Sequence, residues 1–130
     1  MATLISHLKI FPGKEREFER VARQMYLKTQ GEPGCHRYEY YRREEPGHYF
    51  SFEIFADYHA FVQHLSAPYH EAADWPSLLE AVRVEWLDPV AGASSAGPTD
   101  EKRAPPDAGE VLRKCYELYR VRATWWQALR

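Results

Sequence analysis

Two residues in the middle of the chain, His64 and Glu53, could move protons. An imidazole changes charge close to neutral pH, so a histidine suits removal of a substrate proton. Glu53 stands in the run FSFEIF, and a carboxylate held among apolar groups has its pKa raised or can orient a histidine. We therefore predict His64 as a general base and Glu53 as its partner. The alternatives are a solvent-bonded helix histidine and a structural glutamate paired with Arg37 or Arg83.

Four further residues are candidates for binding a flat substrate: Tyr69, His70, Trp75 and Tyr26. His70 follows His64 by six residues within PYHE, where a helix is expected to break, and could turn toward the same pocket. A helix-capping or surface position is its alternative. The aromatic residues would supply flat amphipathic surface, and plain core packing is the alternative for them.

Histidines and acids also gather over residues 57–71, as a metal site would require. No pair of histidines is spaced four apart beside a glutamate in the HExxH manner. His59 and His64 are five apart, so they point away from each other on a helix. No GxGxxG loop is present either. The sequence therefore predicts neither a resident metal nor a bound nucleotide cofactor.

The composition limits the partners. The chain of 130 residues carries 17 basic and 19 acidic side chains, a net charge of -2, which would not draw it to nucleic acid or to an anionic membrane. Cys35 and Cys115 have no metal-ligand spacing and are expected to be reduced thiols. The first ten residues lack a signal-peptide pattern, and no long apolar run follows, so we expect a cytoplasmic protein.

Hydrophobic periodicity predicts strands over residues 3–10, 35–43, 48–55 and 82–87. It predicts helices over residues 14–30 and from an N-cap at Asp57 to about Pro68. Residues 69–79 give a mixed pattern, because Pro76 interrupts a helical spacing. The order strand, helix, strand, strand, helix, strand is that of a ferredoxin-like α+β domain, which we place at residues 1–90.

The remainder of the chain differs in composition. Residues 91–109 read AGASSAGPTDEKRAPPDAG and are expected to form a flexible linker. Apolar residues from Val111 to Leu129 recur at helical spacing, which predicts an amphipathic helix over residues 110–130. Its apolar stripe would dock on protein; its five basic residues leave a membrane surface as the alternative.

Four segments together resemble the antibiotic biosynthesis monooxygenase family: HLKIFPGKEREFE, EPGCHRYEY, HYFSFEIFAD and FVQHLSAPYH. The resemblance runs from about Ala2 to Pro89. It implies a homodimer in which two sheets pack face to face into an α/β barrel, with a pocket between each sheet and its helices. Within it, His64 matches the histidine of the family's second-helix motif and Glu53 a glutamate often found at that strand position.

The activity that the resemblance implies is cofactor-independent oxidation of a phenolic, anthrone-like or quinol substrate by dioxygen. A deprotonated, electron-rich phenol can reduce dioxygen directly, so the protein need supply only a base and a dry pocket. Haem degradation is disfavoured, because Ser6, His64 and about Asp74 stand where the family's haem enzymes use Asn, Trp and His. Two alternatives stay open: a small-molecule isomerase or lyase of the autoinducer-2-degrading type, and a non-catalytic dimeric ligand-binding module.

Overall fold

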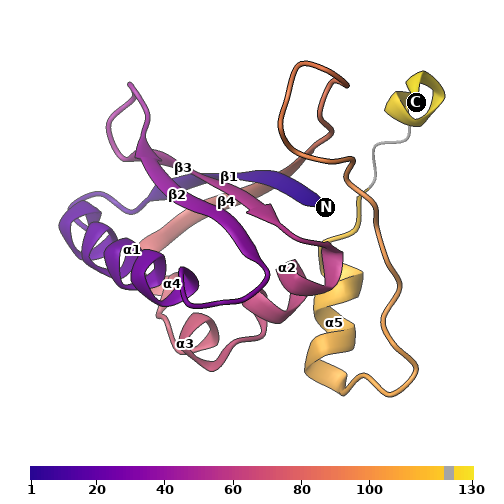
Figure 1. Ribbon diagram of the computed structural model, residues 1–130. Helices are drawn as coiled ribbons and strands as arrows, with labels where there is room; N and C mark the ends of the chain where they lie inside the picture. The colour runs from indigo at the N-terminus through magenta and orange to yellow at the C-terminus, as the bar shows by residue number, and fades with distance from the viewer. Residues whose placement is uncertain (122–124) are drawn as a thin grey trace.

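The fold is a four-stranded antiparallel sheet with its helices packed on one side (Figure 1). It was obtained as a computed structural model that describes residues 1–121 and 125–130. The sheet order is β2-β3-β1-β4, which confirms the ferredoxin-like α+β prediction. The strands span β1 Ala2–Ile10, β2 Cys35–Arg42, β3 His48–Phe55 and β4 Leu79–Leu87.

Strand register decides which polar side chains meet at the centre of the sheet. Ser6 of β1 lies opposite Ser51 of β3 and Val84 of β4, and Leu4 lies opposite Glu53. Side chains alternate between the two faces of a sheet, so these residues share the face covered by the helices. Tyr49, Ser51, Glu53 and Phe55 are accordingly buried, whereas the residues between them are half-buried on the other face.

Four helices cover the inner face: α1 Glu15–Thr29, α2 Tyr58–Leu65, α3 Pro68–Glu71 and α4 Trp75–Leu78. Asp57 caps α2 as predicted, its carboxylate accepting a hydrogen bond of 2.8 Å from the backbone N–H of Ala60. Pro68 and Pro76 each lie in the first turn of a short helix. The mixed pattern over residues 69–79 thus reflects two helix starts, because proline fits the first turn, where its missing N–H is not needed.

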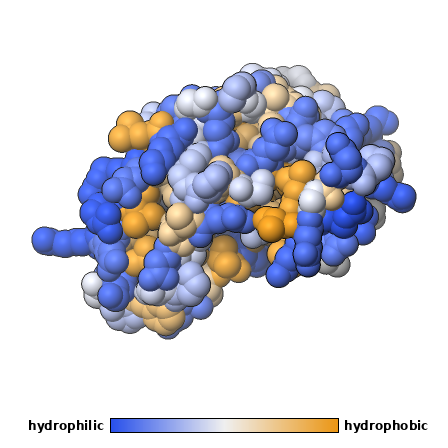
Figure 2. All heavy atoms as spheres, turned by 90° about the horizontal axis from the view of Figure 1, so that it is seen from below, coloured by the Kyte–Doolittle hydropathy of each residue, from blue (hydrophilic) through white to orange (hydrophobic). Residues whose placement is uncertain are grey.

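The core forms two adjoining clusters on this inner face. The larger contains Leu4, Phe55, Phe61, Val62 and Tyr58, all nearly inaccessible to solvent, and the smaller surrounds Phe18 beneath α1. Figure 2 looks onto the helical side, where apolar side chains emerge in separate patches between hydrophilic ones.

Beyond β4, residues 91–130 form an irregular segment followed by α5 Glu110–Leu118 and a 3-10 helix, η1 Trp125–Leu129. We call residues 91–130 the C-terminal extension. Helix α5 packs against α2 (Figure 1), and the hydroxyl of Tyr58 donates a hydrogen bond of 2.9 Å to the carbonyl oxygen of Tyr119. The prediction of one helix over residues 110–130 was wrong in its length: α5 ends at Leu118, Arg120 and Val121 are irregular, and a separate short 3-10 helix follows at Trp125–Leu129. The stretch at 122–124 lies outside the described residues.

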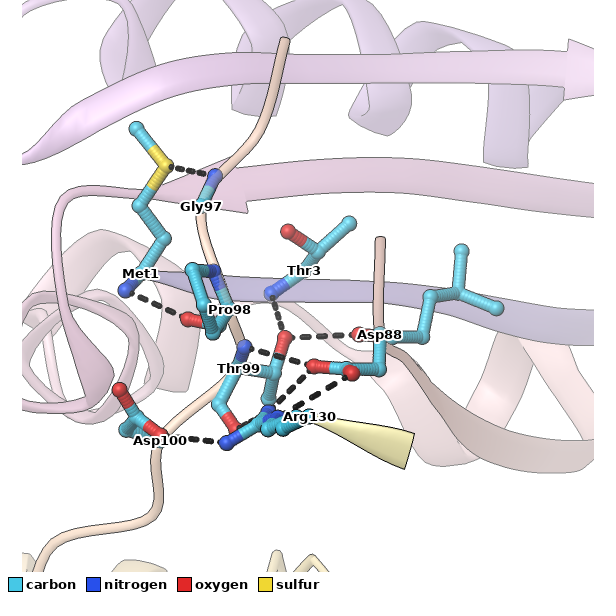
Figure 3. Close-up of polar contacts among 9 residues, drawn as sticks. Met1, Thr3, Asp88, Gly97, Pro98, Thr99, Asp100 and Arg130 are labelled. Carbon is cyan, nitrogen blue, oxygen red and sulfur yellow. Dashed lines mark hydrogen bonds and ion pairs between the residues drawn. The ribbon is translucent and has the colours of Figure 1, made fainter. Parts of the chain in front are cut away.

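The extension is fastened to the end of the sheet by a group of polar contacts, the terminal anchor (Figure 3). Thr99 is buried; its hydroxyl donates to the carbonyl oxygen of Leu87 at 2.7 Å and accepts from the backbone N–H of Thr3 at 3.2 Å. Arg130 forms ion pairs with Asp88 and Asp100. The first strand, the last strand and the end of the chain are thereby joined.

Two smaller expectations concern the cysteines and the membrane. Cys35 and Cys115 are both free and half-buried, and burial raises the pKa of each thiol, that of Cys35 to about 11. Among the described residues, no helix combines the length and the apolar character needed to cross a bilayer.

Candidate functional site

A cavity of about 180 Å³ lies between the inner face of the sheet and the segment from α2 to α4. Most of its wall is apolar, with leucine and valine side chains from β1, α2 and β4. The polar and aromatic side chains that line it come from β1, β2, β3, the α3–α4 region and the C-terminal extension: Ser6, Tyr38, Tyr40, Ser51, Glu53, His70, Trp75 and Tyr119.

Glu53 is the acidic group of this wall. It is only 5% exposed, and one carboxylate oxygen accepts hydrogen bonds from the hydroxyls of Ser51 at 2.8 Å and Ser6 at 3.5 Å. Burial raises the pKa of Glu53, while a charge on His64 and the two hydroxyls act in the opposite direction. Glu53 is therefore a carboxylate held more basic than usual at the surface of an apolar cavity.

His64 lies behind the cavity wall. It is 1% exposed, and its Nδ1 lies 3.1 Å from a carboxylate oxygen of Glu32. A carboxylate can only accept, so Nδ1 carries the hydrogen of this contact. Within the described part of the chain, Nε2 is buried and has no hydrogen-bond partner. The Glu32–His64 pair thus fixes the orientation of the imidazole and leaves Nε2 free to contact a bound group.

Glu32 also accepts a hydrogen bond from the hydroxyl of Tyr69, whose other neighbour is the hydroxyl of Thr29 at 3.3 Å. Burial acts to raise the pKa of Glu32, but the hydrogen bonds from His64 and Tyr69 outweigh it, so the pKa is lowered. Burial, together with Glu32, raises the pKa of Tyr69 to about 12. Glu32 is therefore the ionised member of this group.

His70 connects the two groups. It lines the cavity, and its ring centroid lies 4.8 Å from that of His64. Burial, with a contribution from a charge on His64, lowers the pKa of His70 to about 4, so its imidazole is neutral at physiological pH. Its carbonyl oxygen accepts a hydrogen bond of 3.0 Å from the indole of Trp75, which fixes both residues at the cavity wall.

Two tyrosines complete the polar wall. The hydroxyls of Tyr38 and Tyr40 lie 2.7 Å apart, and burial raises the pKa of both. They therefore stay protonated at neutral pH. One hydroxyl donates its hydrogen to the other, which leaves the pair one hydrogen to donate to an oxygen of a bound molecule.

The six residues singled out from the sequence are thus divided among three places. Glu53, His70 and Trp75 line the cavity. His64 and Tyr69 lie behind it, and both are hydrogen-bonded to Glu32. His64 therefore pairs with Glu32 and not, as predicted, with Glu53. Tyr26 is 44% exposed and lies in a separate groove between α1 and β2.

Several residues of this site were not predicted from the sequence. Tyr38 and Tyr40 could have been found from their alternation on one face of a predicted strand. Glu32, in the turn after α1, and Tyr119, in the extension, carry no local signal.

The arrangement suits acid–base chemistry on a small, flat, apolar molecule. A base of raised pKa, a hydrogen-bonded pair of phenols with one hydrogen left to donate, and a neutral imidazole converge on a cavity that is otherwise apolar. Among the described residues, no group of three or more His, Cys, Asp or Glu side chains is placed to hold a metal ion. The chemistry available to these side chains is proton transfer and hydrogen bonding.

Comparison with known proteins gives one family. The sequence model described as "Antibiotic biosynthesis monooxygenase" matches residues 1–74, more than half of the chain. No protein with curated annotation matches the sequence.

Solved structures share the fold. A candidate antibiotic biosynthesis monooxygenase from Caulobacter crescentus is 33% identical, with a TM-score of 0.64, and the match covers 68% of this chain and 89% of that one. A protein from Mycobacterium tuberculosis is 25% identical over 72% of this chain and 98% of its own, with a TM-score of 0.65. The match extends over almost the whole length of both neighbours, so the matched part of this chain corresponds to nearly all of each neighbouring protein.

Proposed function

This chain belongs to the antibiotic biosynthesis monooxygenase family, and we propose that it oxidises a single-ring phenol or quinol with dioxygen, without a bound cofactor. The observation that carries the proposal is the convergence of Glu53, Tyr38 and Tyr40 on the 180 Å³ cavity. An engineered cavity of about 150 Å³ accommodates benzene. A volume of this size therefore favours one aromatic ring over a fused polycyclic ring system in the cavity itself.

The overall reaction balances without an external reductant. A phenol and dioxygen give a para-quinone and water, and a quinol and dioxygen give a hydroxyquinone and water. In both, one oxygen atom of dioxygen is inserted into the ring substrate and the other leaves as water with two hydrogens from the substrate. All four electrons that reduce dioxygen come from the substrate. The protein's task is to remove the phenolic proton, because the phenolate gives up electrons far more readily than the phenol.

Glu53 is the group best placed to remove that proton, since it lines the cavity and its pKa is raised. This differs from the assignment made on the sequence, where His64 was the base and Glu53 its partner. His64 is separated from the cavity, so we assign it as a positioning residue that supports His70 and stabilises the Glu53 carboxylate. The Tyr38–Tyr40 pair would donate its remaining hydroxyl hydrogen to the phenolate oxygen.

Oxygen uptake with 2-methylhydroquinone tests the proposal. Glu53→Gln keeps the shape of the side chain but cannot accept a proton, so kcat is expected to fall by about a hundredfold or more. His64→Ala is expected to lower kcat less, by about tenfold, and to shift the pH profile.

Glu44→Gln, at an exposed position in the β2–β3 turn, is the matched control and should keep wild-type turnover. Full oxygen uptake by a folded Glu53→Gln protein would refute the assignment of the base. Binding of the quinol by wild-type protein without any oxygen uptake would favour the non-catalytic ligand-binding module.

We also propose that the active form is a homodimer. Tyr41, Phe50, Phe52 and Ile54 lie on the face of the sheet that no helix of the described chain covers, and all four are partly or largely accessible. An accessible apolar face of this kind is the usual sign of an interface. Light scattering that gives the mass of one chain at micromolar concentration would contradict the dimer.

A further inference from the structure

A second hollow, the outer groove, runs along β4 between this edge strand and the C-terminal extension. Its volume is about 1150 Å³, several times that of the cavity. Val82, Val84 and Tyr119 line both the outer groove and the cavity. The two are therefore neighbouring compartments that share a wall, and a molecule that extends past these three side chains would enter both.

The outer groove offers apolar surface. Leu118 of α5, Trp125 and Leu129 of η1, and Val82 of β4 line it, and all four side chains are largely exposed. Large apolar side chains gathered on opposite walls of a groove mark a binding site for an apolar group.

The charged side chains of the groove are already paired. Glu85 accepts from His7 at 2.7 Å, and Arg120 donates to Glu101 at 3.0 Å. Arg130 is held by the terminal anchor, with Asp100 at 2.9 Å. Because these charges are neutralised by partners, the surface left to receive a ligand is apolar.

Both walls of the outer groove lie beyond residue 74, where the family match ends: β4 forms one wall, and Leu118, Tyr119 and η1 of the C-terminal extension form the other. The terminal anchor ties η1 to β1 and β4 through Arg130 and Thr99, so the wall formed by the extension is fastened to the sheet (Figure 3). The extension thus adds a compartment beside the cavity.

We propose that the outer groove binds an apolar substituent of the substrate whose ring occupies the cavity, so that the preferred substrate is a quinol or phenol carrying a long alkyl or polyprenyl-like chain. This inference rests on the proposed function. Val82, Val84 and Tyr119 lie at the junction of the two compartments, where the ring would join its substituent. A chain in the outer groove removes more apolar surface from water than a ring in the cavity alone, which is the source of the preference.

Calorimetric titration under nitrogen tests this proposal, because binding is then measured without turnover. The probes are 2-methylhydroquinone, which fills the cavity alone, and 2-decylhydroquinone, which reaches the outer groove. We expect the decyl compound to bind one per chain and more tightly by about tenfold or more.

The variants Leu118→Ser and Leu129→Ser should reduce this preference several-fold while leaving the affinity for 2-methylhydroquinone unchanged. Leu27→Ser is the matched control, because Leu27 is 70% exposed, compared with 77% for Leu129, but lies on α1 away from the outer groove. It should leave both affinities unchanged.

Equal affinities for the two probes, or an equal loss in Leu27→Ser, would overturn the proposal. Conversion of a dimer to a monomer by Leu118→Ser and Leu129→Ser would also overturn it, by assigning the groove to a second copy of the chain. Oxygen uptake measured in parallel separates the two proposals. If the decyl compound binds more tightly but no oxygen is consumed, only the proposed function is refuted. If oxygen is consumed but the two probes bind equally tightly, only the proposal for the outer groove is refuted.

Discussion

The terminal anchor and the cavity cluster, which we define as Glu32, Glu53, His64, Tyr69 and His70, both bury polar groups, but they satisfy them differently. In the anchor, the N–H, hydroxyl and carbonyl oxygen of Thr99 are each hydrogen-bonded. Among the residues the structure describes, Thr3 Oγ1 beside this group and Trp126 Nε1 of η1 are buried without a hydrogen-bond partner. In the cluster, Nε2 of His64 is unpartnered and Glu53 faces an apolar cavity.

This difference distinguishes polar contacts that stabilise the fold from polar groups that are available for a reaction. A buried polar group with its partners in place contributes to stability, whereas one left unpaired costs free energy. A buried carboxylate of raised pKa costs stability for the same reason. The anchor therefore has the properties of a structural device, and the cluster has those of a site that is completed by a ligand.

The largest expected effect is on the anchor. Thr99→Val keeps the volume of the side chain but leaves the carbonyl of Leu87 and the N–H of Thr3 unpaired. The free energy of unfolding in urea should fall by about 1–3 kcal/mol. Thr99→Ser, which retains the hydroxyl, should lose much less. Unchanged stability of Thr99→Val would remove the distinction between the two regions.

The second effect is a pH dependence located in the cluster. The pKa of His70 is lowered from 6.5 to about 4 in the folded chain, so between these values the unfolded chain binds a proton that the folded chain does not. Stability should therefore fall as the pH drops through this window, by at most about 3 kcal/mol from this residue. The lowered pKa of Glu32 adds to the loss below pH 4.5, while the raised pKa of Glu53 opposes it.

Urea unfolding between pH 7.5 and pH 4 measures this dependence. His70→Asn should show a shallower loss of stability on acidification than the wild type. His36→Asn, at an exposed position on β2, is the control and should follow the wild-type curve. A wild-type slope in His70→Asn would mean that His70 is not protected from protonation in the folded chain.

The smallest effect is the stability of Glu53→Gln. Because burial raises the pKa of Glu53, its ionised form costs stability above that pKa, and the cost disappears as the pH falls through it. The variant should be as stable as the wild type at pH 8, or more stable by about 1 kcal/mol, and the difference should vanish on acidification. A large loss of stability at pH 8 would make Glu53 structural, like Thr99.

Much of the fold could be predicted because its signals are local. The alternation of Tyr49, Ser51, Glu53 and Phe55 sets the buried face of β3, and Asp57 begins α2 where a cap was expected. The mixed pattern of residues 69–79 was not resolved into α3 and α4, because a proline reads as an interruption until its position in a helix is known.

The features of the site can likewise be separated into those set by neighbouring residues in the sequence and those set by tertiary packing. The sequence by itself determined that Glu53 shares one strand face with Tyr49, Ser51 and Phe55 and that His64 lies on the helix that follows, since periodicity and helix boundaries are properties of neighbouring residues. Only the tertiary structure decided that His64 pairs with Glu32 rather than Glu53, that Tyr26 faces away, and that Tyr119 reaches the cavity from the extension. These pairings join residues far apart in the chain, and they depend on how the helices and the C-terminal extension pack on the sheet, which no local pattern encodes.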